Sequence, residues 1–303
     1  MRFERMLTYR GRRERRLDAE SFTELYLALC QDLTVARANN YSPALISRLN
    51  RLVHAGYRLL YKARPFSIRR IIRFWRIDFP RTVRDTISAV ILTALLFYGL
   101  GFFSYLLVRT YPQAAYIIAG EDTLVSLERM YDPDGERLHH QRDENTDAGM
   151  FAFYIYNNVS IGFRIFAGGV FFGIGSLLIL IFNGVFFGTV WAHLIHMGYQ
   201  STFLSFVIGH GFIELNAFVL CGVAGLKMGW ALTAPGNLSR RDALKRAADR
   251  ALPLVYGGAG MLFVAAVIEA FWSARPLSFE IKAAFAVTAA VLNILYFWLS
   301  GRR

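Results

Sequence analysis

The chain has 303 residues, of which 55% are hydrophobic and 15% aromatic, whereas only 18% are charged. Soluble domains carry about 25% charged residues, so this composition argues against a wholly soluble protein and favours an integral membrane protein. The formal net charge of +12 is segregated: residues 1–84 are strongly basic, residues 109–150 are acidic and residues 227–250 are basic again. Because basic and acidic blocks alternate around apolar stretches, the positive-inside rule explains the charge better than nucleic-acid binding does. We therefore expect membrane lipids as partners and no nucleic acid.

The N-terminal region predicts a helical hairpin over residues 20–62. Apolar residues recur at helical spacing after Ser21, which can cap the first helix. Residues 39–41, Asn-Asn-Tyr, interrupt this pattern, and Ser42 and Pro43 are typical of the start of a second helix. We assign residues 1–80 to a cytoplasmic domain made of this hairpin and of the basic helix that follows it.

The basic helix is predicted over Ser67–Phe79, where isoleucines and aromatic residues alternate with arginines. This pattern is typical of a helix that lies in the head-group interface, with its aromatic side in the membrane and its arginines on phosphates. The residues predicted to contact lipid head groups are Arg69, Arg70, Arg73, Trp75 and Arg76. Pro80 then directs the chain into the bilayer.

Residues 81–303 predict an all-α, polytopic membrane helix bundle. The expected spans, about six, cover residues 85–108, two segments within 151–198, and residues 201–228, 251–272 and 279–299. A turn near Gly173-Ile174-Gly175 or at Asn183-Gly184 would divide residues 151–198, and five spans result if part of that stretch is re-entrant. Residues 109–150 then form an acidic outer segment and residues 229–250 a basic cytoplasmic one, with both termini cytoplasmic.

Polar residues inside the apolar spans form the candidate site, because a charged group in the membrane is costly unless it is paired or functional. His210 and Glu214 are four residues apart and share one face of a helix. Counting about 1.5 Å per residue places Arg164 at the depth of Glu214, so we expect these two to form an ion pair. The predicted intramembrane cluster is Arg164, Asn183, His210, Glu214 and Asn216. Secondary polar residues are Asn157, Asn158, Glu269 and Asn293.

Catalytic and metal chemistry find little support in these residues. His210 and Glu214 lack the second histidine of a His-Glu-x-x-His zinc motif, and Ser205 has no distinctive context for a nucleophile. The acidic residues at 132–136 lack the full twelve-residue ligand pattern of a calcium loop. The two cysteines, Cys30 and Cys221, are far apart. We expect no catalytic residue, no metal and no cofactor.

Three functions fit this pattern. The first is a non-enzymatic scaffold that recruits envelope or cytoplasmic proteins, with the polar cluster fixing the bundle. The second is a transporter or channel-like permease, in which the cluster is the substrate or proton path. The third is an intramembrane hydrolase. Partner identity and homo-oligomer formation are left open by the sequence.

Several short segments of the chain together resemble one family. They are Leu25-Tyr26 with Asp32-Leu33 and Ala36-Arg37, Leu49-Asn50-Arg51-Leu52-Val53-His54-Ala55 with Tyr61, Asp78-Phe79-Pro80 with Arg84, Tyr156-Asn157-Asn158, Phe182-Asn183-Gly184 with Gly188, and His210-Gly211 with Glu214-Leu215 and Ala217. In their order and spacing these segments resemble the stage II sporulation protein M family. Asn216 departs from the small residue or proline of that pattern.

The resemblance implies a multi-spanning protein of the bacterial or archaeal cytoplasmic membrane. In spore formers, the namesake of the family is a membrane anchor that assembles peptidoglycan hydrolases during engulfment. Relatives also occur in organisms that make no spores, so the resemblance does not by itself imply a sporulation role.

Overall fold

The computed structural model describes residues 19–60, 67–134 and 144–302, and the described residues form helices and no strands. The chain divides into two compact units, Met1–Ser67 and Ile68–Arg303. The basic helix after Ser67 therefore belongs to the second unit.

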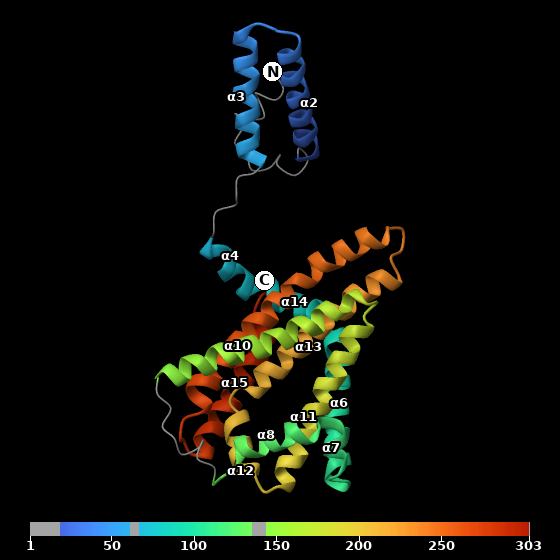
Figure 1. The fold of residues 1–303 in the computed structure, drawn as a ribbon. Helices are drawn as coiled ribbons and strands as arrows, with labels where there is room; N and C mark the ends of the chain where they lie inside the picture. The colour runs from blue at the N-terminus through green and yellow to red at the C-terminus, as the bar shows by residue number, and fades with distance from the viewer. Residues whose placement is uncertain (1–18, 61–66, 135–143, 303) are drawn as a thin grey trace. The chain divides into compact units, whose positions relative to one another are not determined.

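The first unit contains the predicted hairpin. Helix α2 (Ala19–Ala38) and helix α3 (Pro43–Leu60) pack side by side (Figure 1). Leu29, Leu33 and Ala36 are buried on α2, as their helical spacing predicts. Asn40 adopts a left-handed conformation with φ of 52° in the turn, which asparagine tolerates better than most residues. The break and the second helix start lie where the sequence places them.

The second unit begins with one nearly continuous basic helix. It comprises α4 (Ile68–Arg73), the π-helix η1 (Phe74–Asp78) and α5 (Phe79–Asp85). Its arginines at 69, 70, 73 and 76 are exposed. Trp75 differs from the prediction, because its ring packs on α14 and occupies the space where a Cβ on Gly260 would lie. Phe79 is fully buried against Gly257, so this face of the helix docks on the bundle.

Among the described residues, the bundle contains six long helices and several short ones. The elements in chain order are α6 (Ile87–Thr110), α7 (Ala114–Ala119), α8 (Glu121–Tyr131), α10 (Glu144–Ala167), η2 (Gly168–Val170), α11 (Ile174–His196), α12 (Gln200–Val207), α13 (Gly211–Thr233), α14 (Arg240–Ile268), the π-helix η3 (Glu269–Ser273) and α15 (Phe279–Leu299). Within the described residues, five segments are long and apolar enough to cross a membrane: α6, α11, α13, α14 with η3, and α15. Helix α10, the expected second span, is not among these five.

The order and direction of the helices nevertheless require α10 to cross the bundle. Helices α6 and α11 run parallel, because Gly184 meets Phe97 and, four residues on, Gly188 meets Gly101. The chain must therefore come back between them, and α10 has 24 residues, or about 36 Å of helix, to do so. Its N-terminal turn pairs with Arg275 beyond η3, and its C-terminal end contacts Ser176 at the start of α11. The chain thus passes between the two ends of the bundle about six times.

The turn between α10 and α11 lies at one of the two predicted places. Gly173 has φ of +83° and precedes the first residue of α11, a conformation that favours glycine. Asn183 and Gly184 instead lie inside α11. A further difference concerns residues 240–250, which were predicted as part of the basic cytoplasmic segment. They form one uninterrupted helix, α14, with the next span. Ser239 caps this helix by accepting from the Asp242 N–H at 3.1 Å.

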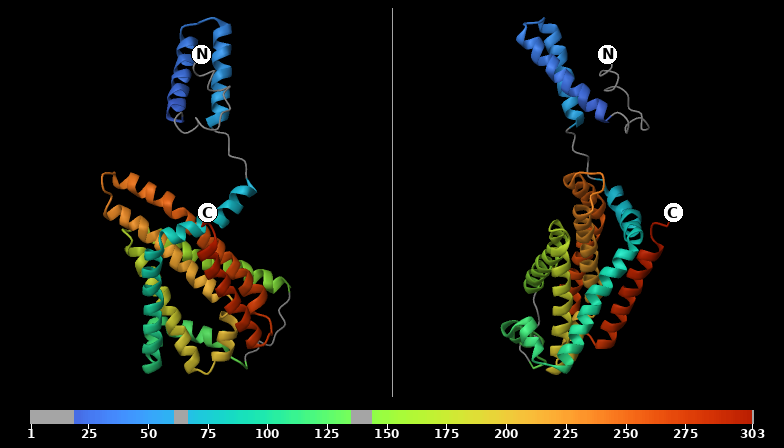
Figure 2. Two further views of the ribbon diagram at one scale, coloured as in Figure 1. Left: turned by 180° about the vertical axis from the view of Figure 1, so that it is seen from behind. Right: turned by 90° about the vertical axis from the view of Figure 1, so that its right-hand side faces the viewer.

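Helix α13 lies at the centre and packs against α14, α10, α11 and α6 (Figure 1). Its small residues allow close approach: a Cβ on Gly225 would lie 2.9 Å from the Ile165 carbonyl oxygen. Figures 1 and 2 show that the C-terminus lies beside the α4–α5 segment, and Gly301 contacts Ile77 there. The short helices α8 and α12 pack together at the opposite end.

Candidate functional site

The polar site of the membrane domain forms between the turn that precedes α13 and the π-turn that ends α14. Residues 208–210 form a turn that separates α12 from α13, and residues 269–273 form the single π-turn η3 at the end of α14. Interruptions of both kinds are frequent at functional sites, because they free backbone groups and redirect side chains. The first break carries His210 and leaves Glu214 in the first turn of α13, while the second carries Glu269 and Ser273.

Three ionisable side chains converge between these breaks. One ligand-capable atom from each of His210, Glu214 and Glu269 lies within 4.8 Å of the other two. His210 and Glu269 are 4% and 8% exposed, respectively, and Glu214 is half-buried. His210 Nε2 lies 3.9 Å from Glu269 Oε1. An imidazole and two carboxylates in this arrangement can hold a divalent cation or share a proton.

Neighbouring polar groups orient two of these three residues. Ser273 Oγ lies 3.0 Å from His210 Nδ1. On the other side, Asn158 of α10 donates from Nδ2 to Glu269 Oε2 at 3.3 Å, and Asn157 donates to Asn158 Oδ1 at 2.8 Å. These contacts direct His210 Nε2 and Glu269 Oε1 toward each other.

Aromatic and cationic groups enclose the cluster. The Phe206 ring meets the His210 ring edge-on, with centroids 5.5 Å apart, and also packs against Tyr131 of α8. Burial, followed by the negative charges of Glu269 and Glu214, raises the pKa of Tyr131 above its ordinary value, so its phenol stays neutral beside them. From α15, Lys282 is buried and donates from Nζ to the Ser273 carbonyl oxygen at 2.8 Å.

The expected ion pair between Arg164 and Glu214 is wrong. Both residues are described, yet Arg164 is exposed and donates from Nε to the Ser160 carbonyl oxygen of its own helix. Depth counting failed because it assumed upright, uninterrupted helices. The break before His210 places Glu214 in the first turn of a new helix, and the α10 residue that reaches this level is Asn158.

The other predicted residues divide between the cluster and the surrounding helices. Asn183 donates to the Ile179 carbonyl oxygen and Asn216 to the Phe212 carbonyl oxygen, so each side chain forms a hydrogen bond within its own helix. Asn293 is half-buried on α15, about 16 Å along the helix from Lys282. Of the predicted cluster, the structure therefore unites His210 and Glu214, and two of the secondary residues, Asn158 and Glu269, join them.

Sequence reasoning gave too little weight to Glu269 and missed Ser273 and Lys282. Glu269 was predicted only as a secondary polar residue, but it is buried and belongs to the cluster. A signal was present: Glu269 and Ser273 are four residues apart at the end of an apolar run, and Lys282 is a lone cation near the start of the next one.

A second histidine–glutamate pair lies away from this cluster. His193 of α11 is 2% exposed, and its Nε2 lies 2.6 Å from Glu128 Oε1 of α8. Tyr116 meets the His193 ring edge-on. The pair ties the short helix α8 to the bundle.

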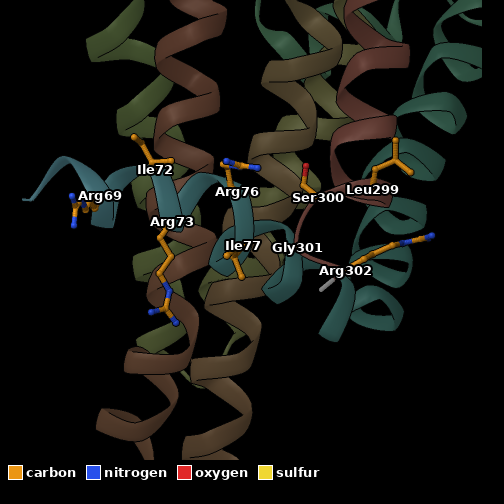
Figure 3. Close-up of a pocket in the computed structure, with 9 residues that line it drawn as sticks. All are labelled: Arg69, Ile72, Arg73, Arg76, Ile77, Leu299, Ser300, Gly301 and Arg302. Carbon is orange, nitrogen blue, oxygen red and sulfur yellow. The ribbon is translucent and has the colours of Figure 1, made fainter. Parts of the chain in front are cut away.

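A basic cavity lies at the opposite end of the second unit. Its volume is about 600 Å³, and Figure 3 shows that the lining comes from α4, η1 and the C-terminal residues. The lining includes four arginines, at positions 69, 73, 76 and 302. Arg302 also stacks over the Trp298 ring at 4.6 Å. A concentration of guanidinium groups beside an apolar surface suits phosphate groups.

Comparisons with known proteins give a family for the chain. Residues 1–62 match a domain of unknown function (DUF8413). No curated protein and no solved structure matches the chain. Residues 88–274 match the family of stage II sporulation protein M. This match covers more than half of the chain and contains every member of the polar cluster except Lys282. The chain is a multi-spanning membrane protein that belongs to the stage II sporulation protein M family.

Proposed function

We propose that the protein is a non-enzymatic scaffold of the cytoplasmic membrane that recruits envelope or cytoplasmic partner proteins through its N-terminal hairpin. The observation that carries this proposal is the exposed apolar surface of a self-contained unit. On α2, Leu27 and Val35 are 57% and 53% exposed, and Tyr57 on α3 is 52% exposed. Exposed apolar side chains on a two-helix unit are typical of protein-binding surfaces.

The membrane domain supports the role of an anchor. A Cβ on Gly188 would lie 1.9 Å from the Gly101 carbonyl oxygen, and one on Gly169 would lie 2.2 Å from the Gly225 carbonyl oxygen. Backbones in such close contact leave little room for helices to slide. A rigid bundle of this kind is what a docking platform requires.

Basic residues give the proposed orientation. The arginines of α4 and η1 and the C-terminal Arg302 lie at one end of the second unit, and the start of α14, with Arg240 and Arg241, lies at the same end by topology. Under the positive-inside rule this end faces the cytoplasm, where the basic cavity would bind anionic lipid head groups.

The polar cluster supports a structural role over catalysis. The cluster has the order of a catalytic triad, with Ser273 Oγ in the place of the nucleophile, His210 of the base and Glu269 of the acid. However, the 3.9 Å between His210 Nε2 and Glu269 Oε1 exceeds hydrogen-bond distance, and Ser273 is 2% exposed. A substrate could not reach this hydroxyl group without local opening, so we propose that the protein has no hydrolase activity.

The scaffold proposal is tested by crosslinking in intact membranes, followed by purification of the full chain and identification of captured proteins. A Leu27→Lys/Val35→Lys variant should lose the captured partners while keeping its membrane insertion and abundance. The matched control is Asp32→Asn, which shifts the charge in the same direction at an exposed polar position of the same helix. Equal capture by the wild type and by the double variant would refute the hairpin as the docking surface.

A second function, a cation-coupled permease, is favoured by one observation. The Glu214 carboxylate lies just after the break between α12 and α13, close to Glu269 of η3, and interrupted helices with buried charges are typical of transporter sites. The scaffold proposal predicts no solute or proton flux in proteoliposomes. A flux that the Glu214→Gln variant abolishes would overturn the scaffold and establish the permease.

A further inference from the structure

We propose that His210, Glu214 and Glu269 bind one divalent first-row transition-metal ion, and that this ion joins the two helix breaks of the bundle. The inference stands apart from partner recruitment, since it concerns the end of the second unit opposite the basic cavity. It also departs from the sequence-based expectation of no metal site, because the sequence did not bring Glu269 to His210.

The ligand set determines the class of ion. One imidazole nitrogen and two carboxylate oxygens suit zinc, manganese or ferrous iron better than magnesium or calcium, which prefer oxygen ligands. Three protein ligands also leave at least one coordination position open. Affinity should follow the usual order of these ions, with zinc above manganese.

The distances are compatible with such an ion after a small contraction. The three ligand atoms lie within 4.8 Å of one another, and His210 Nε2 and Glu269 Oε1 are 3.9 Å apart. Bonds of about 2.1 Å in a tetrahedral site place ligand atoms about 3.4 Å apart. Rotation of the glutamate side chains covers this difference without a change in the backbone.

The outer contacts are those that metal ligands require. A ligating histidine usually engages a polar partner through its second ring nitrogen, and a ligating carboxylate is held through its second oxygen. Ser273 engages His210 Nδ1, and Asn158 holds Glu269 Oε2. Both contacts lie on the far sides of the ligand groups, so they orient the near atoms toward a common point.

Charge balance points the same way. Two ionised carboxylates in an apolar bundle are costly, and a divalent cation neutralises both. Of the described cations, Arg164 is exposed and bonded within α10, and Lys282 directs its ammonium group at the Ser273 carbonyl oxygen. The ion would also connect the start of α13 to the end of α14, and so close the bundle where both helices are interrupted.

The experiment uses the full chain, purified in detergent without an affinity tag, stripped with a chelator and then dialysed against Zn²⁺ or Mn²⁺. Elemental analysis should find about one ion per chain in the wild type. Glu214→Gln and Glu269→Gln should each weaken binding by more than 100-fold, and Asn158→Ala, which keeps all three ligands, by about 10–100-fold. The matched control is Glu128→Gln, which alters the other histidine–glutamate pair and should bind like the wild type.

A metal-binding measurement on the wild type keeps the test decisive even if a variant does not fold. With Co²⁺ in place of zinc, the visible spectrum should show a low-symmetry site with a nitrogen ligand, and added Zn²⁺ should displace it. A folded wild type that holds no stoichiometric Zn²⁺ or Mn²⁺ would refute the site, and the two carboxyl groups would then share a proton. Equal loss of the ion in Glu128→Gln and Glu269→Gln would refute it as well, because binding would not depend on these ligands.

Discussion

The contact between α6 and α11 gives the sharpest prediction about stability. Gly188 of α11 lies against the backbone of Gly101 on α6, and a Cβ at position 188 would lie 1.9 Å from the Gly101 carbonyl oxygen and 2.7 Å from its carbonyl carbon. Ordinary van der Waals contact begins at 3.4 Å. A Gly188→Ala variant must therefore separate the two helices locally by about 1.5 Å, and backbone atoms cannot move aside as a flexible side chain could.

This separation would also disturb the buried hydrogen bond between Thr189, the residue after Gly188, and Ser104, about one turn beyond Gly101, whose oxygens are 2.6 Å apart. Overpacking of a well-packed interior costs about 1–3 kcal/mol. At roughly 2–4 °C per kcal/mol for a domain of this size, we expect the Gly188→Ala unfolding midpoint to fall by about 2–12 °C.

The assay is thermal unfolding of the purified full chain in one detergent at one scan rate, followed by the loss of near-ultraviolet circular dichroism. The control is Gly99→Ala on α6, because nothing lies within 4 Å of a Cβ at Gly99. Alanine is also the better helix former, so Gly99→Ala should unfold at or above the wild-type midpoint. If both variants unfold at the wild-type midpoint, or if both fall equally, the close contact between α6 and α11 does not limit stability and the reasoning is refuted.

Three further predictions concern single features. Arg164→Gln should change the free energy of unfolding by less than about 0.5 kcal/mol, because its side chain is exposed. A loss of several kcal/mol in the same thermal assay would indicate that Arg164 does form an ion pair. Ser239→Ala should cost about 1 kcal/mol through loss of the α14 cap, measured by hydrogen exchange in the first turn of that helix, and unchanged exchange there would argue against the cap. Arg73→Gln/Arg76→Gln should reduce the number of anionic lipids that remain bound in native mass spectrometry, whereas Arg109→Gln/Arg164→Gln should not, and equal retention by both pairs would exclude the basic cavity as a lipid site.

Local features of the fold were predictable because they depend on neighbours in the sequence. The break at residues 39–41 and the glycine turn at Gly173, one of the two predicted places, each follow from the conformational preferences of a few adjacent residues. The glycine pair at 184 and 188 has the four-residue spacing that allows close helix contact, but its partner, Gly101, cannot be named from the sequence.

The candidate site was only partly predictable, since its members come from distant segments. His210 and Glu214 are four residues apart on the chain, so the sequence paired them directly. Glu269 and Asn158 reach them only through the packing of α13 against α14 and α10. Counting residues wrongly assigned this place to Arg164, because the depth of a residue depends on the tilt and the ends of its helix, which the sequence does not show.

By itself, the sequence determined that this protein is an all-helical, multi-spanning membrane protein with a separate N-terminal hairpin. That outcome follows from hydrophobicity and charge summed over long segments, and such sums do not depend on which helix touches which. Only the tertiary structure decided that His210, Glu214 and Glu269 share one site and that Arg164 is outside it. The depth and direction of each side chain are set by the helix breaks at residues 208–210 and 269–273 and by the crossing of α10. This arrangement depends on contacts between residues more than 50 positions apart.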